Sequence, residues 1–125
     1  MASDRQKEAM VVLVVDDDSA VLSVTAELFR YLGYDVLAAD SGYDALDILQ
    51  SDEPVDVLFA DLCMPRMDGG YLVEAARALR PALHVIVTSG SALPRQHVQF
   101  IPKPYHIADL VAALPPERAL HEPAG

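Results

Sequence analysis

The sequence predicts an α/β domain with a doubly wound, five-stranded parallel sheet, and three observations support this prediction. Five short apolar runs alternate with segments whose apolar residues recur every three or four positions. The first run is apolar at every position, as expected for a strand covered by helices on both faces. No repeat or internal linker interrupts the alternation. Because strands that alternate with helices imply right-handed crossovers, we expect a single parallel-sheet domain.

The first predicted strand covers residues 11–15, and a helix follows it. Asp18 or Ser19 can cap the start of this helix, and Gly33 lies where a left-handed residue is needed at its end. The helix is expected to bury the apolar residues that recur at helical spacing, which are Val21, Val24, Leu28 and Leu32.

The second predicted strand covers residues 35–39. Ser41 and Asp44 after it resemble a capping box in which Asp replaces the usual Glu, so a second helix is expected to begin here. The residues expected to be buried in that helix are Ala45, Ile48 and Leu49.

The third predicted strand covers residues 55–60. Pro65 and the pair Gly69-Gly70 form its exit loop, and Pro81 ends the next helix, which is predicted over residues 70–79. The residues expected to be buried in this helix are Leu72, Ala75, Ala76 and Leu79.

The fourth and fifth strands are predicted over residues 84–87 and 98–101, and the last helix over residues 106–114. The last helix is expected to bury Ile107, Leu110, Val111 and Leu114. Only eight residues separate Ser89 from Val98, whereas a crossover with its helix needs roughly ten to twelve. The fourth helix is therefore predicted to be short or absent.

Composition narrows the classes of partner. The chain has 125 residues, 52% of them hydrophobic, and a net charge of −10. A domain of this size can bury a sizeable core. Because Lys and Arg form no cluster, we expect neither direct nucleic-acid binding nor binding to an anionic membrane.

Cys63 is the only cysteine, so no intrachain disulfide can form, which fits a reducing compartment. The N-terminal residues form neither a signal peptide nor a membrane span, and we expect a cytoplasmic protein. Residues 1–9 and 115–125 are predicted to be disordered tails on a domain of residues 10–114.

Polar residues directly follow four of the apolar runs; they are Asp16, Asp17, Asp61, Thr88 and Lys103. Because the carboxyl ends of parallel strands meet at one edge of a sheet, where such proteins bind ligands, we expect these side chains to gather. Two carboxylates about 4 Å apart repel by roughly 1 to 4 kcal/mol, so a cation is expected among the three. A partly hydrated site of few carboxylates beside a phosphate suits Mg²⁺ better than Ca²⁺.

Asp61 is the natural nucleophile for phosphoryl transfer, since Lys103 can neutralise a phosphoryl oxygen and Thr88 supplies a hydroxyl donor. Pro104 makes the bond after Lys103 a candidate cis peptide. Taken singly, each of these residues also fits an ordinary cap or turn, as Asp18 does. The four together, at compatible strand ends, favour a metal-assisted phosphoryl-accepting site.

The chain resembles the receiver domain of two-component response regulators over residues 10–114. The matching motifs are Val14-Val15-Asp16-Asp17-Asp18, Phe59-Ala60-Asp61-Leu62-Cys63-Met64-Pro65-Arg66-Met67-Asp68-Gly69, Val87-Thr88-Ser89-Gly90 and Phe100-Ile101-Pro102-Lys103-Pro104. The resemblance implies a flavodoxin-like strand order of 2-1-3-4-5. It also implies phosphorylation of Asp61 by a phosphohistidine on a histidine kinase or histidine phosphotransferase.

By the same resemblance, Asp17, Asp61 and the backbone carbonyl of Cys63 hold Mg²⁺, and Asp16 contacts it through water. Thr88 is similar to the residue whose hydroxyl moves to the phosphoryl group of a receiver. Phe100 is similar to the aromatic switch residue whose ring then rotates inward; a plain core aromatic is the alternative for Phe100.

The resemblance favours a stand-alone receiver, a phosphoacceptor rather than an enzyme, that acts as relay, sink or adaptor on an unknown downstream protein. Segments shortened like residues 90–97 also occur in receivers of hybrid histidine kinases, which is the alternative. That shortening removes part of the face on which many receivers dimerise, so the usual homodimer is in question.

Two other classes compete with these. Asp16-x-Asp18 faintly matches the nucleophile motif of haloacid-dehalogenase-like phosphatases, which would make Asp16 the nucleophile, but that family needs more chain for a later acidic motif. A receiver fold used as a constitutive interaction module is the last alternative, and the complete acidic set argues against it.

Overall fold

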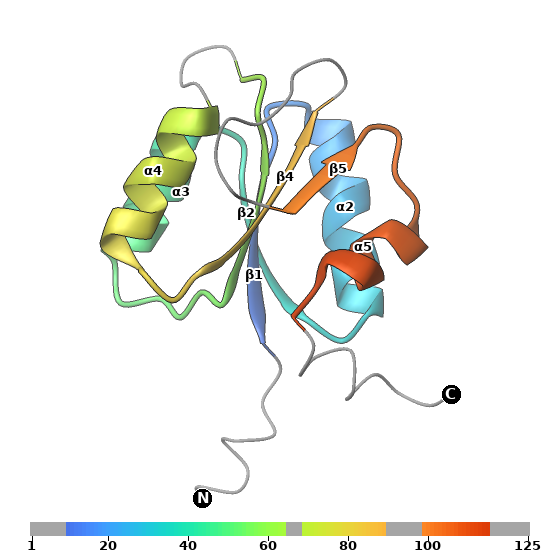
Figure 1. Ribbon diagram of the computed structural model, residues 1–125, viewed down its shortest axis with the longest axis horizontal. Coiled ribbons are helices and arrows are strands. Elements are labelled where there is room, and N and C mark those ends of the chain that lie inside the picture. Colours follow the sequence, from blue (N-terminus) through green and yellow to red (C-terminus); the bar gives the residue numbers. More distant parts are fainter. Residues whose placement is uncertain (1–9, 65–68, 90–98, 116–125) are drawn as a thin grey trace, which may run out of the picture.

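The computed structural model describes residues 10–64, 69–89 and 99–115. Its five strands all run parallel in one sheet of order β2-β1-β3-β4-β5, so the predicted fold is confirmed (Figure 1). The strands are β1 (Val11–Val15), β2 (Asp35–Ala39), β3 (Val57–Asp61), β4 (His84–Ser89) and β5 (Gln99–Pro102).

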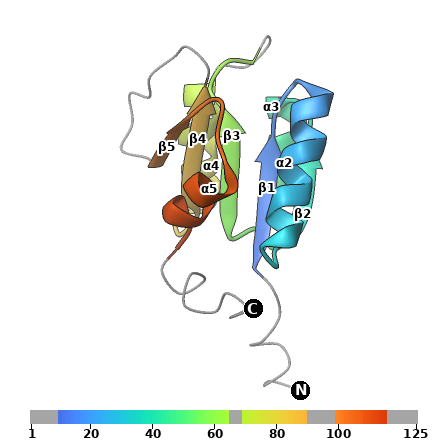
Figure 2. The same ribbon diagram turned by 90° about the vertical axis from the view of Figure 1, so that its right-hand side faces the viewer.

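The described residues form four helices, which cover both faces of the sheet. They are α2 (Ser19–Tyr31), α3 (Gly42–Gln50), α4 (Gly69–Leu79) and α5 (Ile107–Ala113). α2 and α5 lie on one face and α3 and α4 on the other (Figures 1 and 2). Leu13 and Val15 of β1 join the core under α3 and α4, whereas Val12 and Val14 join the core under α2 and α5. The all-apolar run therefore becomes a central strand buried on both sides.

Several predictions fall on residues outside the described ranges. The segment 90–97, in which the fourth helix is predicted to be short or absent, lies outside them, as do the predicted tail of residues 1–9 and residues 116–125 of the other tail. Pro115 is described, and it is buried. Among the helices of the described residues, none is long and apolar enough to cross a membrane.

β1 and β2 have their predicted bounds, but β3 starts two residues later than predicted. Val57 is its first residue because Asp56 is engaged with the start of β1. The Asp56 Oδ2 atom accepts a 2.8 Å hydrogen bond from the Val11 N–H. The Asp56 N–H in turn donates to the Val11 carbonyl over 2.8 Å.

β4 extends two residues past its predicted end at Val87. Thr88 and Ser89 pair with Ile101 and Pro102 of β5, and Thr88 also pairs with Asp61 of β3. Two residues that looked like the start of a loop are therefore part of the sheet. β5 ends at Pro102, one residue past its predicted end.

The N-terminal cap of α2 is Asp18, whose side chain accepts hydrogen bonds from the N–H groups of Ala20 and Val21. Gly33 has φ 96°, so the predicted left-handed residue is confirmed. The predicted buried face of α2 is partly wrong, because Val24 is 60% exposed. Val21 and Leu28 are only half-buried, whereas the fully covered residues of the helix are Thr25, Ala26 and Phe29.

The other helices differ less from prediction. In α4, Leu79 is exposed rather than buried, and Val73, which was not predicted, is fully covered. α4 begins at Gly69, one residue before its predicted start. α5 is one residue shorter at each end, since His106 and Leu114 are its caps. Ser41 caps α3 by accepting a 3.1 Å hydrogen bond from the Asp44 N–H.

Candidate functional site

Three carboxylates gather at the carboxyl end of the sheet, where the arrowheads of β1 and β4 point in Figure 2. Asp16 and Asp17 follow β1, and Asp61 is the last residue of β3. One oxygen from each of the three lies within 4.8 Å of the other two. Asp16 and Asp61 are 3% and 5% exposed, whereas Asp17 faces solvent. The predicted clustering of these residues is present in the structure.

Backbone N–H groups orient the two buried carboxylates. Asp16 Oδ1 accepts a 2.9 Å hydrogen bond from the Asp18 N–H. Asp61 Oδ1 accepts a 3.0 Å hydrogen bond from the Cys63 N–H. Each carboxylate therefore has one oxygen held by the backbone, and the second oxygen faces the ammonium group.

The Lys103 ammonium bridges the two buried carboxylates. Its Nζ lies 3.1 Å from Asp16 Oδ2 and 3.1 Å from Asp61 Oδ2. Burial lowers the pKa of Lys103, but its hydrogen bonds to Asp61 and Asp16 outweigh that effect, and the net pKa is raised. The ammonium therefore stays charged and offsets part of the carboxylate repulsion. The Lys103–Pro104 peptide bond is cis.

Thr88 contributes a buried hydroxyl beside Asp61. It pairs with Asp61 in the β3–β4 ladder, is 0% exposed, and its carbonyl accepts a 2.9 Å hydrogen bond from the Leu62 N–H. Within the described parts of the chain, no hydrogen-bond partner lies within reach of Thr88 Oγ1. A buried polar atom in this condition is unusual, which makes it a candidate to bind a group that joins the site.

Two further predicted residues lie close to these groups. Cys63 is exposed, and its Sγ is 3.4 Å from the Ser89 Oγ. Phe100 is half-buried and packs against the core under α3 and α4. The metal-binding role of the Cys63 carbonyl and the switching role of Phe100 stay predictions.

Sequence reasoning missed a pair of hydroxyl groups beside Lys103. Thr25 Oγ1 of α2 lies 2.6 Å from the Tyr105 hydroxyl, and Thr25 is 1% exposed. The Tyr105 ring meets the Phe59 ring edge-on at a centroid distance of 5.5 Å. Burial raises the pKa of the Tyr105 phenol, which keeps it protonated. The two residues are 80 positions apart, so no local pattern could have linked them.

A hard divalent cation such as Mg²⁺ fits this donor set. The three carboxylates offer only oxygen ligands, and carboxylates at this spacing repel unless a cation offsets their charge. Lys103 offsets only one of three negative charges. Asp17, which is exposed, leaves an open side from which an ion and its water ligands can enter.

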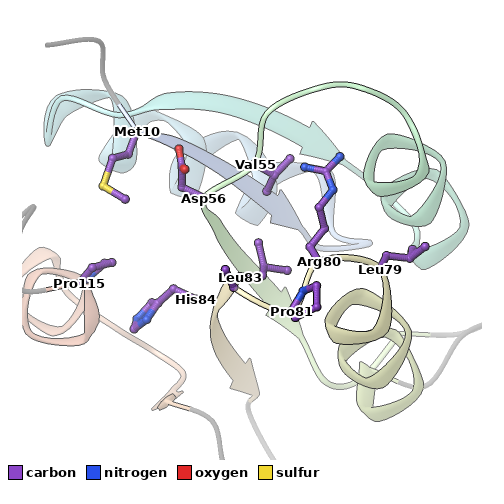
Figure 3. A pocket seen from close by; sticks show the side chains of 10 residues that line it. Met10, Val55, Asp56, Leu79, Arg80, Pro81, Leu83, His84 and Pro115 are labelled. Carbon is purple, nitrogen blue, oxygen red and sulfur yellow. The ribbon is translucent and has the colours of Figure 1, made fainter. Parts of the chain in front are cut away.

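A cavity of about 590 Å³ lies at the other end of the sheet (Figure 3). Arg80 lines this cavity, and its Nε and Nη2 donate to the carbonyls of Leu49 and Ser51 over 3.1 and 3.0 Å. His84 bonds the Ala113 carbonyl at 2.8 Å. These groups hold loops and helices together, so the carboxyl end of the sheet remains the candidate site.

The family profile described as "Response regulator receiver domain" matches residues 12–115. Response regulator MprA of Mycobacterium avium (strain 104) is 33% identical over 113 residues, which cover 84% of this chain and 49% of that protein. MprA of Mycobacterium tuberculosis (strain ATCC 25618 / H37Rv) is 32% identical over 111 residues. The chain thus spans about half the length of the curated relatives it matches.

Solved structures give the same result. The receiver domain from the hybrid histidine kinase CckA is 35% identical, with a TM-score of 0.76 and coverage of 87% of this chain and 98% of that one. A response regulator receiver protein from Sinorhizobium medicae WSM419 is 25% identical, with a TM-score of 0.79 and coverage of 91% and 97%.

Proposed function

The chain belongs to the response regulator receiver domain family, and from this premise we propose that Asp61 accepts a phosphoryl group from a phosphohistidine. The donor is a histidine kinase or a histidine phosphotransferase. The observation that carries the proposal is the bridge of Lys103 to Asp16 and Asp61, beside a third carboxylate. This arrangement holds a nucleophile and a counter-charge in reach of one incoming group.

The chemistry assigned to these residues is a displacement at phosphorus. An oxygen of the Asp61 carboxylate forms the new P–O bond, and the P–N bond of the phosphohistidine breaks, with its electron pair going to the imidazole nitrogen. Lys103 lies at 3.1 Å from the acceptor carboxylate and can shift to a phosphoryl oxygen without leaving the site. The N–H of Cys63 holds the other Asp61 oxygen in place during attack.

Asp16, Asp17 and Asp61 are the residues that would hold Mg²⁺, which when bound supplies positive charge against the oxygens of the transferring group. Without a cation, an incoming dianionic phosphoryl group would meet three carboxylates and one ammonium. The proposed ligation by the Cys63 carbonyl completes the oxygen set.

Thr88 is proposed to report the phosphorylated state. Its hydroxyl is buried beside Asp61 and, among the described residues, lacks a partner, so a phosphoryl oxygen on Asp61 would supply one. Phe100 pairs with Val87, the residue before Thr88, in the β4–β5 ladder. A move of Thr88 toward Asp61 would then open space for the Phe100 ring to turn inward.

An open groove of about 570 Å³ beside Lys103 supports access by a protein donor. It is lined by α2 residues, among them the exposed Val24, and by Pro104 and Tyr105. The wall is mostly apolar, as a surface that receives another protein often is.

We propose that the domain serves as a relay, sink or adaptor in the cytoplasm, passing its state to a downstream protein. A receiver within a hybrid histidine kinase is the second candidate, and the 35% identity to the CckA receiver supports it. Phosphatase chemistry at Asp16 is not favoured, because the family profile that matches residues 12–115 is that of the receiver domain.

The test is to incubate the protein with Mg²⁺ and acetyl phosphate and measure its intact mass. Wild type and Asp16→Asn are expected to gain one phosphoryl group, the variant more slowly because it loses a carboxylate of the metal set. Asp61→Asn is expected to gain none. Hydrolysis of a phosphate ester that depends on Asp16 and survives Asp61→Asn would contradict the proposal.

A further inference from the structure

We propose that the hydrogen bond between Thr25 and Tyr105 positions the Lys103 ammonium, so that Thr25 and Tyr105 are positioning residues of the phosphoryl-accepting site. The inference builds on the proposed function, since it names two residues that act through Lys103. Neither residue lies within the four motifs that carry the family resemblance.

Tyr105 lies where the three segments that carry the site meet. It follows Lys103 by two residues, and its ring contacts Phe59, which precedes Asp61 by two residues in β3. Its hydroxyl contacts Thr25 in α2, the helix that begins directly after the acidic residues at the end of β1. In Figure 1 the orange connection from β5 to α5 accordingly runs beside α2.

The backbone around Lys103 needs an anchor on its far side. On the strand side, the Lys103 N–H donates a 3.0 Å hydrogen bond to the Ser89 carbonyl. On the other side, Pro104 is exposed and has no N–H to donate. Tyr105 is the next residue, and its ring and hydroxyl are both engaged. Because a lysine side chain is long and has many rotatable bonds, the position of its ammonium depends on how firmly its backbone is held.

The contact between Thr25 and Tyr105 depends on their two hydroxyl groups. Thr25 is 1% exposed and lies on the inner face of α2 between apolar neighbours, a position where Val would pack as well. A buried polar group in such a place destabilises the folded state unless it makes a hydrogen bond. Thr25→Val and Tyr105→Phe each remove one hydroxyl and keep the shape, whereas Thr25→Ser keeps the hydroxyl.

The chain offers a direct probe, because it contains only two lysines, Lys7 and Lys103. In protein labelled with ¹⁵N-lysine, each ammonium gives its own NMR signal, and proton exchange at Lys103 reports its contacts with Asp16 and Asp61. Measured without Mg²⁺ or phosphodonor, Lys103 exchange is expected to be about fivefold faster in Thr25→Val and Tyr105→Phe than in wild type. Lys7 is the internal reference, and Thr25→Ser is expected to match wild type.

Val57→Ala is the matched control, because Val57 is fully buried in the same core at the opposite end of β3. It is expected to lower stability while leaving Lys103 exchange unchanged. The same variants are then phosphorylated with acetyl phosphate at saturating Mg²⁺. Thr25→Val and Tyr105→Phe are expected to lower the maximal rate about fivefold without changing the affinity for Mg²⁺.

The exchange measurement tests the positioning role of Thr25 and Tyr105, and the phosphorylation measurement tests phosphoryl transfer to Asp61. Unchanged Lys103 exchange in both Thr25→Val and Tyr105→Phe, or an equal change in Val57→Ala, overturns the positioning role even if wild type is phosphorylated. Altered exchange, rescued by Thr25→Ser, supports the positioning role even if wild type does not accept a phosphoryl group. A wild-type protein that gains no phosphoryl group would instead contradict phosphoryl transfer to Asp61.

Discussion

Two buried threonines near the site differ in the hydrogen bonding of their hydroxyl groups. Thr25 Oγ1 has a partner 2.6 Å away, whereas Thr88 Oγ1, among the described residues, has none. Both are nearly inaccessible to solvent, at 1% and 0% exposure. The Thr25 hydroxyl therefore stabilises the folded state, whereas the Thr88 hydroxyl destabilises it. This difference fits the proposal that Thr88 gains its partner only when a phosphoryl group is present.

Replacing each threonine by Val tests this difference. Thr88→Val is expected to leave the free energy of unfolding unchanged or to raise it by up to about 1 kcal/mol, because it removes an unsatisfied buried hydroxyl. Thr25→Val is expected to lower it by about 1 kcal/mol, because it breaks a hydrogen bond. Urea unfolding of the unphosphorylated protein measures both. A loss of more than about 1 kcal/mol in Thr88→Val would mean that its hydroxyl is satisfied in the resting state.

At the residue scale the sequence was most informative where polar residues end apolar runs. Asp16, Asp61 and Lys103 were predicted to gather, and they make direct contacts. Thr25 and Tyr105 could not be predicted, because Thr25 occupies an ordinary inner helix position and its partner comes from a distant loop. A hydrogen bond between remote segments has no signal in local sequence.

At the element scale, the spacing of apolar residues predicted that α2 is a helix, but it did not predict which residues of that helix are buried. Val21, Val24 and Leu28 recur at helical spacing, yet the covered residues are Thr25, Ala26 and Phe29. The helix is turned toward Phe59, whose ring meets Phe29 edge-on at 5.3 Å. Apolar residues outnumber the places available in the core, so the pattern alone could not choose among them.

Substitutions on the two sides of α2 test this orientation. Phe29→Ala is expected to lower the free energy of unfolding by about 3–5 kcal/mol, because it leaves a cavity under the helix. Val24→Thr, at a position 60% exposed, is expected to change it by less than about 0.5 kcal/mol. Urea unfolding of the two variants beside wild type gives both values. A similar loss in both variants would place Val24 in the core.

The strand ends were predicted less well than the strand centres. β4 continues through Thr88 and Ser89 because both pair with β5, although Ser and Gly after Thr88 are typical of a loop. Pairing with a neighbouring strand outweighed that local preference. The consequence for function is that Thr88 is part of the sheet and opposite Asp61 in the ladder.

For the whole molecule, bound Mg²⁺ is expected to stabilise the fold. At 10 to 100 times its dissociation constant, a ligand that binds only the folded state adds about 1.4 to 2.7 kcal/mol to the free energy of unfolding. Thermal unfolding with and without millimolar MgCl₂ at neutral pH measures this effect, and NaCl of equal ionic strength controls for screening of the net charge of −10. Asp17→Asn is expected to reduce the rise; an equal rise in that variant would argue against a specific site.

Stability is expected to fall on the alkaline side. Burial raises the pKa of Tyr105 above its ordinary value of about 10, so above that pH the unfolded chain loses a proton that the folded protein keeps. The stabilisation is complete below pH about 10 and is lost as the pH rises through the folded-state pKa. The raised pKa of Lys103 acts in the same direction.

Tyr105→Phe is therefore expected to show a shallower loss of stability between pH 9 and about 11 than wild type, measured by urea unfolding. Tyr31→Phe, a change at a ring that is 79% exposed, is the control and is expected to follow wild type. Parallel curves for wild type and Tyr105→Phe would contradict the effect of burial on this phenol.

The Lys103 bridge has a consequence for charge balance at the carboxyl end of the sheet. Three carboxylates and one ammonium leave a local charge of −2, which one divalent ion brings to neutrality. Conversion of the Asp61 carboxylate to a fully ionised acyl phosphate changes this sum by only one further negative unit. Because the Lys103 ammonium already contacts both Asp16 and Asp61, a small displacement is enough for it to contact an added phosphoryl oxygen. With a divalent ion bound, the proposed phosphorylation would therefore change the local charge only from neutral to −1.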